Sequence, residues 1–367
     1  MQPDYSVAVI GDWDADGIVS TAIVYYTQSR LGVFPLRGRR IPFTSPGGPR
    51  SFPEVVASLK VCPKVLVVLD IPYTSEVAEG LKSFRGRGCS GRVYYFDHHP
   101  STIDSLPELE DELKVDAVVG RSATAVLLRT FLAGMNVKLT PRLEGFVRAV
   151  AVLEGSKKRV PQLSQEEIVE ERLVQIAASM SKALNLTRDP ELWRSYVEWL
   201  ANPIPFESPK VRLPGVNAEL DLIEASIDMG READEEAKQA AIDLAMSAEN
   251  LGYIKFVDAR GKWKKRGATA LAGYIHRMTG QPVAVLVEKR DGSLLLVIRA
   301  SHGAAVRIAE ILKAMNALED VGGHGNVATG RLRQGLSLDK LKSMLRRAVF
   351  QALQETRRFK DNRSQNL

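Results

Sequence analysis

Cysteine is scarce in this sequence, with only Cys62 and Cys89 among 367 residues. Neither has a histidine or a second cysteine at metal-ligand spacing, which argues against a zinc site or a disulfide-rich framework. We therefore predict two free thiols in a reducing compartment and assign them no role.

Long apolar runs are also missing. No segment approaches the roughly 20 apolar residues of a membrane-spanning helix, and the N-terminal segment turns acidic at Asp12, where a signal peptide would still be apolar. The chain has 45% hydrophobic and 26% charged residues, enough for two compact domains. We expect a soluble, cytoplasmic protein.

Basic residues exceed acidic ones, giving a formal charge of +6 and a pI of about 9.2. This balance suits a polyanionic partner such as nucleic acid without proving one. The basic residues gather in four clusters, at 36–40, 156–160, 261–267 and 346–363. Each cluster is equally compatible with a solvated face or a frayed terminus.

Short apolar runs alternate with helical patterns in the first part of the chain. The runs SVAVIGD, KVLVVLD and RVYYFD are strand-like, and the alternation predicts an α/β fold with a parallel sheet. Each run ends on an aspartate, at Asp12, Asp70 and Asp97. Because parallel strands end at one edge of a sheet, these carboxylates should converge there, and such convergence needs a cation.

The rest of the chain predicts a connector and a second domain. Residues 156–251 are helical and charged, with a proline-rich break at 202–215, and strand-like runs return after Gly252. We predict a first α/β domain at 1–155, a helical connector at 156–251, a smaller second α/β domain at 252–350 and a basic tail at 351–367. The last residues, 360–367, are expected to be disordered.

The segment GDWDADGIVS places three acids, Asp12, Asp14 and Asp16, at the end of an apolar strand and before a helix. A purely structural role is difficult to supply, because repulsion and desolvation are costly without a positive partner. Carboxylates offered in this way suit hard, oxygen-preferring cations such as Mn²⁺ or Mg²⁺. Gly17 lets the chain turn into the following helix.

Two further groups follow at the other strand ends. Asp70 alone is a weak signal, because aspartate is common at a turn or helix cap. Asp97, His98 and His99 place two of the five histidines beside an acid, and imidazole oriented by a carboxylate is a frequent metal ligand. A buried structural histidine pair is the alternative.

Together GDWDADG, VVLD and FDHH resemble the first three motifs of the DHH phosphoesterase superfamily, and the first is most like its RecJ-like exonuclease and nanoRNase branch. The resemblance extends over about 1–155 and 252–350. It implies two divalent cations, Mn²⁺ or Mg²⁺, held by the first domain. The compact RecJ-like arrangement also resembles archaeal members of the family, but this second resemblance is weak.

The resemblance implies a role for each residue of these motifs. Asp14 would bind one metal, Asp16 and His98 the other, and Asp70 would bridge them. His99 would face the substrate phosphate. Asp97 would orient the histidine pair or reach a metal itself. Several branches have a histidine where this chain has Ile10, and Asp12 would supply that missing ligand.

The fourth motif departs from the family pattern. The family has an aspartate after a helix, and the aligned segment FVRAVAVLEGS places Glu154 there. A glutamate also binds metals, but its longer side chain shifts the carboxylate. Ser122 and Thr124 resemble the family's Ser/Thr-rich turn before a helix, where they would act either as plain N-caps or as phosphate contacts.

The second half resembles the DHH-associated substrate-binding domain. VIRAS supplies Arg299 and Ser301, which can bind a phosphate or a strand end, and VGGHGN supplies Gly322, Gly323 and His324. A glycine turn with a chance histidine is the alternative. The loop has one glycine fewer than the family signature before the histidine.

Three functions remain open. The first, which the basic clusters and the RecJ-like first motif favour, is a nuclease that releases nucleotides from single-stranded DNA or RNA, or from short oligonucleotides, across an interdomain cleft. The second is a phosphatase or phosphodiesterase for a small nucleotide, such as phosphoadenosine phosphate or a cyclic dinucleotide. The short chain favours this second function or a nanoRNase. The third is a replication or repair scaffold of the same ancestry with lost catalysis. Repair proteins could dock on the acidic middle helices, no membrane partner is expected, and the oligomeric state is open.

Overall fold

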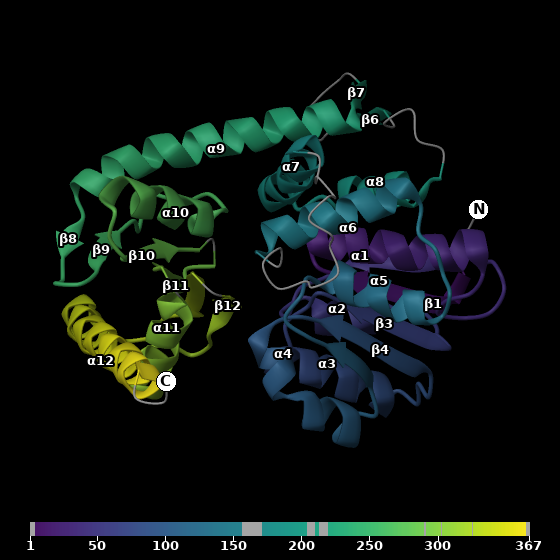
Figure 1. Cartoon of the computed structure of the whole chain (residues 1–367), viewed down its shortest axis with the longest axis horizontal. Coiled ribbons are helices and arrows are strands. Elements are labelled where there is room, and N and C mark those ends of the chain that lie inside the picture. Colours follow the sequence, from purple (N-terminus) through teal and green to yellow (C-terminus); the bar gives the residue numbers. More distant parts are fainter. Residues whose placement is uncertain are drawn as a thin grey trace. The chain divides into compact units, whose positions relative to one another are not determined.

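The computed structural model describes residues 4–155, 171–203, 210–212, 219–289, 291–301, 303–324 and 326–364. The chain forms two compact units, Met1–Arg231 and Glu232–Leu367 (Figure 1). Each unit has hydrophobic clusters of its own. The basic cluster predicted at 156–160 lies outside the described residues.

The first unit is built on a sheet of five parallel strands in the order β2-β1-β3-β4-β5. The strands are β1 (Asp4–Gly11), β2 (Pro42–Pro46), β3 (Val65–Leu69), β4 (Arg92–Asp97) and β5 (Asp116–Val119). All five residues of β3 are buried, as expected for a central strand that is covered on both faces. The predicted α/β class with a parallel N-terminal sheet is confirmed.

Helices cover both faces of this sheet. The helical segments before Glu154 are α1 (Ala15–Tyr26), η1 (Thr27–Leu31), α2 (Phe52–Ala57), α3 (Ser75–Gly86), α4 (Pro100–Asp104), η2 (Glu108–Glu112), α5 (Thr124–Gly134) and α6 (Pro141–Leu153). Alternate residues of β1 face opposite layers: Val7 and Val9 pack with α1, α5 and α6, whereas Ala8 and Ile10 pack with α2 and α3.

Two further helices, α7 (Glu171–Thr187) and α8 (Pro190–Ala201), belong to the first unit. Their apolar faces, with Met180, Trp193 and Tyr196 fully buried, join the same cluster as α1 and α5. Sequence patterning assigned these helices to a separate connector at 156–251. Their buried stripes place them instead on the first unit, and a hairpin of β6 (Lys210–Arg212) and β7 (Glu219–Asp221) follows them.

A disulfide joins Cys62 to Cys89. The prediction of two free thiols is therefore wrong. The two residues precede neighbouring parallel strands, and Val65 of β3 pairs with Arg92 of β4, so the strand register also aligns the cysteines. Distance along the sequence concealed this proximity.

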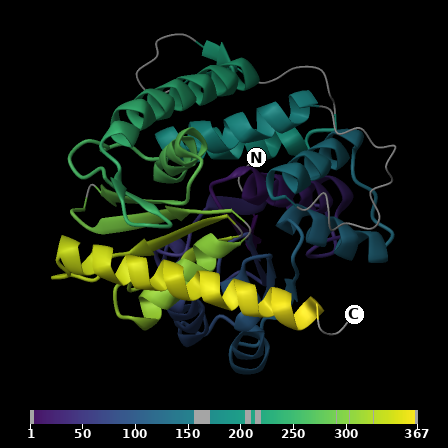
Figure 2. The same ribbon diagram turned by 60° about the vertical axis from the view of Figure 1, so that its left-hand side comes forward.

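The second unit contains a six-stranded mixed sheet in the order β12-β13-β11-β10-β9-β8, as predicted for its class. The strands are β8 (Glu249–Asn250), β9 (Lys255–Asp258), β10 (Val283–Glu288), β11 (Leu294–Arg299), β12 (Gly322–His324) and β13 (Val327–Arg331). The helices are α10 (Ala268–Thr279), α11 (Ala304–Ala314) and α12 (Leu338–Ser364). α11 and α12 pack on one face and α10 on the other (Figure 2).

Helix α9 (Leu222–Met246) spans the boundary between the units. Leu222 and Ile223 are buried in the core of the first unit, whereas Ala237, Ala241 and Leu244 are buried in the core of the second. The division therefore falls within a helix.

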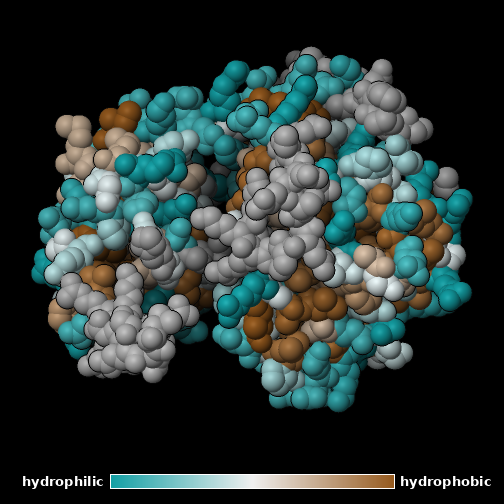
Figure 3. Space-filling view, viewed as in Figure 1, coloured by the Kyte–Doolittle hydropathy of each residue, from teal (hydrophilic) through white to brown (hydrophobic). Residues whose placement is uncertain are grey.

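The C-terminal segment differs from the prediction. Helix α12 continues to Ser364, so most of the segment 360–367 that we expected to be disordered is helical. Within the described ranges, no helix combines the length and the apolar character needed to cross a lipid bilayer. In Figure 3 the visible surface is largely hydrophilic, with separate hydrophobic patches on the first unit.

Candidate metal centre

The acidic groups predicted to converge lie at the ends of three neighbouring strands. Asp12 follows β1, Asp70 follows β3, and Asp97 is the last residue of β4. The backbone N–H of Asp12 donates to the carbonyl of Leu69 at 3.1 Å, and that of Asp70 donates to the carbonyl of Phe96 at 2.9 Å. These bonds continue the sheet and hold the three strand ends in register.

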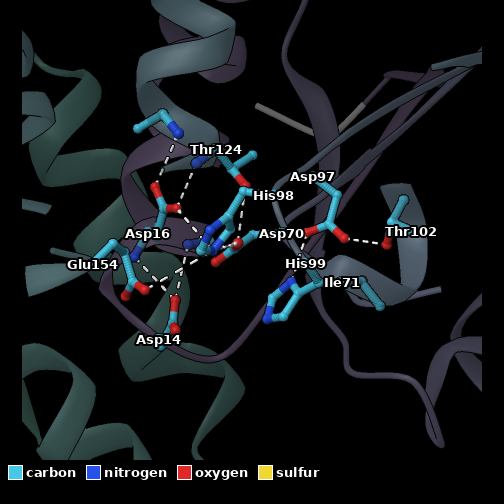
Figure 4. A network of polar contacts seen from close by, with 12 residues as sticks. Asp14, Asp16, Asp70, Ile71, Asp97, His98, His99, Thr102, Thr124 and Glu154 are labelled. Atoms are coloured by element: carbon cyan, nitrogen blue, oxygen red, sulfur yellow. Dashed lines mark hydrogen bonds and ion pairs between the residues drawn. The ribbon is translucent and has the colours of Figure 1, made fainter. Parts of the chain in front are cut away.

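Three carboxylates surround the imidazole of His98 (Figure 4). Its Nε2 lies 3.3 Å from Asp70 Oδ1, 4.0 Å from Asp16 Oδ2 and 4.0 Å from Glu154 Oε2. Glu154 follows α6 directly and is therefore brought to the place expected for the fourth motif. His98, His99 and Asp70 also each offer a ligand atom within 4.8 Å of one another.

Asp16 and Asp70 are held by the start of α5. The backbone N–H groups of Thr124 and Ala125 donate to the two carboxylate oxygens of Asp16 at 2.6 and 2.9 Å, and Thr124 Oγ1 donates to Asp70 Oδ1 at 2.9 Å. The N-cap residue of α5, Ala123, offers no side-chain bond. Thr124 therefore orients two carboxylates, while the half-buried Ser122 lies in the turn before the helix.

Asp14 caps helix α1. Its carboxylate accepts from the backbone N–H groups of Asp16 at 3.0 Å and Gly17 at 3.1 Å. A Cβ added at Gly17 would lie 2.6 Å from the backbone N and O of Asp12, so only glycine fits the turn there. The alternating acids thus have a local reason for their spacing: one caps the helix while Asp16 points from its first turn to α5.

Beside these groups, the buried Asp97 pairs with the partly exposed His99. His99 Nδ1 lies 2.8 Å from Asp97 Oδ1, and Thr102 Oγ1 donates to the other carboxylate oxygen. Asp97 is fully buried. The resemblance suggested that Asp97 orients both histidines or reaches a metal, whereas its hydrogen bonds orient His99.

The crowded carboxylates have raised pKa values. Burial, together with Asp14, raises the pKa of Asp12 and that of Asp16 to about 7. Burial also raises the pKa of Glu154 to about 8, with Asp14 and Asp16 adding to the rise. The pKa of Asp70 lies well above its usual range, because it is buried and then because Asp16 is close.

In the pair of Asp97 and His99, by contrast, both pKa shifts favour the charged form. Burial alone would lower the pKa of His99, but its ion pair and hydrogen bond with Asp97 raise it to about 9. Burial would raise the pKa of Asp97, but His99 and Thr102 lower it below its usual value. His99 is therefore a cation at neutral pH, next to carboxylates that resist losing their protons.

This donor set fits hard divalent cations. Asp16 and Asp70 are each 1% exposed, and burying several carboxylates together without positive charge is unfavourable. Carboxylate oxygens with one imidazole nitrogen are ligands that Mn²⁺ and Mg²⁺ accept. Asp14, Asp16, Asp70, His98 and Glu154 would hold them, with Asp12 adjacent.

Several contributing residues carry no signal in the sequence. Trp193 Nε1 donates to the carbonyl of Asp12 at 3.0 Å, and Ser181 Oγ accepts from the N–H of Ala15 at 2.8 Å. Arg188 stacks on the indole of Trp13. These residues come from α7, α8 and the turn between them, far from the motifs, and only folding brings them to the loop after β1.

The predicted substrate-binding residues of the second unit lie around the end of β11. Arg299 is the last residue of β11, and burial, with the nearby Arg277, lowers its pKa. Ser301 is exposed two residues later. Gly323 has φ of 126°, and a Cβ there would clash with Val327, so strand pairing by itself requires this glycine. His324 ends β12, and its side chain lies outside the described part.

The five-stranded parallel sheet, followed by a smaller unit with a mixed sheet, gives this chain the fold of DHH-domain proteins. No protein-family model matches the sequence, and no curated protein matches it.

Among solved structures, the chain is similar to a DHH-domain protein described as a member of the s1p family of ribosomal proteins, with a TM-score of 0.64, 16% identity and coverage of 94% of this chain and 87% of that one. The chain is also similar to RecJ from Thermus thermophilus in complex with Mn²⁺, with a TM-score of 0.56 and 16% identity. That match covers 94% of this chain and 52% of the RecJ chain. A third similar structure is a pGpG-specific phosphodiesterase from Vibrio cholerae, with a TM-score of 0.50 and 12% identity. That match covers 95% of this chain and 99% of the phosphodiesterase. The chain thus spans about half the length of that RecJ.

Proposed function

We propose that this protein is a divalent-cation-dependent phosphodiesterase that releases nucleotides from the ends of single-stranded DNA or RNA, or from short oligonucleotides. The observation that carries the proposal is the convergence of Asp16, Asp70 and Glu154 within 4.0 Å of His98 Nε2. Bound cations, which we take to be two and Mn²⁺ or Mg²⁺, would activate water and neutralise charge on the phosphate oxygens.

The chain's own groups have separate tasks in this reaction. Thr124 and the α5 amides fix Asp16 and Asp70, so the carboxylates need little rearrangement. His99 is held by Asp97 through Nδ1, which leaves Nε2–H to donate to an oxygen of the substrate phosphate. The hydrogen bond and ion pair with Asp97 raise the pKa of His99 and so favour the doubly protonated imidazole, which has that proton.

A feature of the second unit favours an anionic substrate. Burial, and then the nearby Arg277, lowers the pKa of Arg299, and a bound phosphate would relieve the repulsion between the two cations. Arg299 and Ser301 would bind the end of the strand, as in our sequence-based assignment. Mn²⁺ or Mg²⁺ is supported by RecJ from Thermus thermophilus, a protein of this fold that has been solved in complex with either ion.

The test is digestion of end-labelled single-stranded DNA and RNA, from dinucleotides to long chains, with Mn²⁺. Asp70→Asn should lower kcat by about a thousandfold or more, because the carboxylate that contacts His98 and Thr124 is lost. Asp111→Asn, which neutralises an exposed acid in η2, is the matched control and should leave the rate unchanged.

Stepwise shortening by the protein and by Asp111→Asn, but not by Asp70→Asn, supports the proposal. Hydrolysis of phosphoadenosine phosphate or a cyclic dinucleotide with no oligonucleotide cleavage would replace it by the small-nucleotide reading. If the parent protein binds Mn²⁺ but hydrolyses none of these substrates, a scaffold role is favoured, and its protein partners would then be sought.

A further inference from the structure

Strand β5 forms one edge of the sheet in the first unit. It pairs with β4 on one side, and no described strand pairs with its other side. The N–H of Gly120, directly after β5, donates to the carbonyl of Asp97 on β4 at 3.3 Å. Because backbone groups alternate in direction along a strand, the N–H and C=O groups of Ala117 and Val119 point away from β4. They are hydrogen-bonded to no described residue, so a further strand can pair there.

An open pocket of about 560 Å³ lies along this edge. Its wall on the α5 face of the sheet is apolar and aromatic, with Tyr94, Val118 and Phe131. On the opposite face the pocket is lined by Ala117 of β5 and Glu110 of the adjoining η2. Since successive side chains of a strand point to opposite faces, a strand added to β5 would present alternate side chains to these two walls.

The wall formed by η2 is acidic. The three acids at positions 110–112 are exposed, and they form no ion pair with any described residue. Lys114 also lines the pocket but is outnumbered by these acids, and Arg92 is already paired, with its Nε 2.6 Å from Asp116 Oδ2. Basic side chains on one face of an added strand would therefore complement the η2 wall.

A second copy of this chain fits the edge poorly. Antiparallel pairing of two β5 strands about a twofold axis keeps equivalent faces of the two sheets on the same side, which brings a second acidic η2 to the acidic wall. Like charges would then repel one another. Pairing with the other edge strand, β2, is also unfavourable, because β2 begins and ends with proline, which has no N–H to donate.

We propose that the outer edge of β5 binds an extended segment of a partner protein in which apolar and basic residues alternate. The segment would add a strand to the sheet, with its apolar side chains on Tyr94, Val118 and Phe131 and its basic side chains along η2. The pocket includes Arg92 at the start of β4, whereas Asp97 ends that strand beside the metal centre. Binding at β5 therefore leaves the metal centre open, and the inference does not depend on the proposed hydrolysis.

The probe is a fluorescein-labelled, end-capped peptide of about eight residues, within the usual length of a strand, in which valine and lysine alternate. Its binding to the full chain is measured by fluorescence anisotropy. We expect saturable binding that weakens with added salt, and slower amide hydrogen exchange at residues 115–119 in the complex. A peptide of the same composition with its valines and lysines in separate blocks should bind at least about tenfold more weakly, because only alternation directs the two kinds of side chain to opposite walls.

Two variants test the two parts of the surface. Ala117→Pro removes an outward N–H but none of the groups that face β4, so it should weaken binding at least about tenfold with little change in melting temperature. Glu110→Lys should weaken binding of the valine–lysine peptide and strengthen binding of a valine–glutamate peptide, a gain that misfolding cannot produce. Glu54→Lys is the matched control, because Glu54 is exposed on α2, which follows the other edge strand, and should change neither affinity.

Each outcome decides the inference. Absence of saturable binding overturns it, and so does equal binding of the alternating and block peptides, which would indicate unspecific attraction to an acidic surface. Binding that leaves hydrogen exchange at residues 115–119 unchanged would place the peptide elsewhere and also overturn it. If the parent protein alone sediments as a dimer that Ala117→Pro dissociates, the edge pairs with a second copy and the partner inference is wrong.

Discussion

At the scale of single residues, the site concentrates groups that repel one another. Asp12, Asp16, Asp70 and Glu154 all have raised pKa values in the folded chain, chiefly because they are buried close to other acids. Asp70 adds a backbone cost, with φ of 61°, which aspartate tolerates better than most residues. These groups therefore lower the stability of the metal-free protein at the place where the cations would bind.

This arrangement predicts how the stability of the metal-free protein depends on pH. A carboxyl whose folded pKa is raised favours folding only while protonated, so its contribution is lost as pH rises from about 4, the unfolded value, to about 7 or 8. His99 acts in the same direction, because its contribution is complete below about 6.5 and lost through about 9. Denaturant titrations from pH 5 to 8 should show unfolding free energies that fall by about 1 kcal/mol or more per pH unit.

Mn²⁺ should remove most of this pH dependence by binding the ionised carboxylates. Glu154→Gln should flatten the metal-free curve, whereas Glu79→Gln, on the exposed face of α3, should not. If the unfolding free energy of the metal-free protein stays level or increases between pH 5 and 8, the raised pKa values of these carboxyl groups and of His99 are wrong.

The sequence predicted the site residues better than their partners. The convergence of Asp16, Asp70 and His98 could be predicted because each lies close to the end of a strand whose apolar pattern is clear, and that of Glu154 from the family resemblance. Thr102 and Arg188 could not, because a threonine after a short helix and an arginine between two helices are ordinary in sequence. Their roles depend on which elements become neighbours.

At the scale of elements, central strands were predicted and edge strands were not. The sequences of β1, β3 and β4 are continuous apolar runs, because both faces are covered. β2 begins and ends with proline, and β5 has four residues of which the first is exposed. Such edge strands carry little apolar pattern, so only the completed sheet reveals them.

The disulfide is an element-scale feature with a measurable consequence. It closes a loop with a sequence separation of 27 residues that includes β3, Asp70 and α3. Loop-closure entropy in the unfolded chain gives a stabilisation of about 3 kcal/mol for a loop of this length. Reductant should therefore lower the unfolding free energy of the parent protein by about that amount.

Cys62→Ser is the control for that measurement. It should lower stability in the absence of reductant, and reductant should then have no further effect. Cys62 is exposed and Cys89 is buried, so substitution of Cys62 disturbs packing least. An equal response of both proteins to reductant would show that the bond does not form in solution.

At the scale of the whole molecule, the metal centre belongs to one unit. Every candidate ligand from Asp12 to Glu154 lies in Met1–Arg231, which has its own cores, including those parts of α7, α8 and α9 that pack on it. The predicted boundary at residue 155 would cut this core. Chain-wide composition could not show that, because α7 and α8 look like charged connector helices until their buried faces are known.

A fragment of residues 1–231 should therefore fold and keep the metal chemistry. Mn²⁺ should raise its melting temperature, and it should hydrolyse a small diester such as bis(p-nitrophenyl) phosphate. Its KM for oligonucleotides should rise at least about tenfold, because Arg299 and Ser301 are absent. The Asp70→Asn fragment is the control. If the fragment has the same KM for oligonucleotides as the full chain, the second unit does not contribute to binding.

The contact between Asp16 and the start of α5 gives the protein a built-in spectroscopic reporter. The amide protons of Thr124 and Ala125 point at the carboxylate that would bind a cation, although neither residue needs to touch substrate. Any change in the electron density on those oxygens alters the resonance frequencies of the two amides and the rate at which their protons exchange with solvent. The loading state of the centre can thus be followed at the end of a helix, without turnover and with metals that support no reaction.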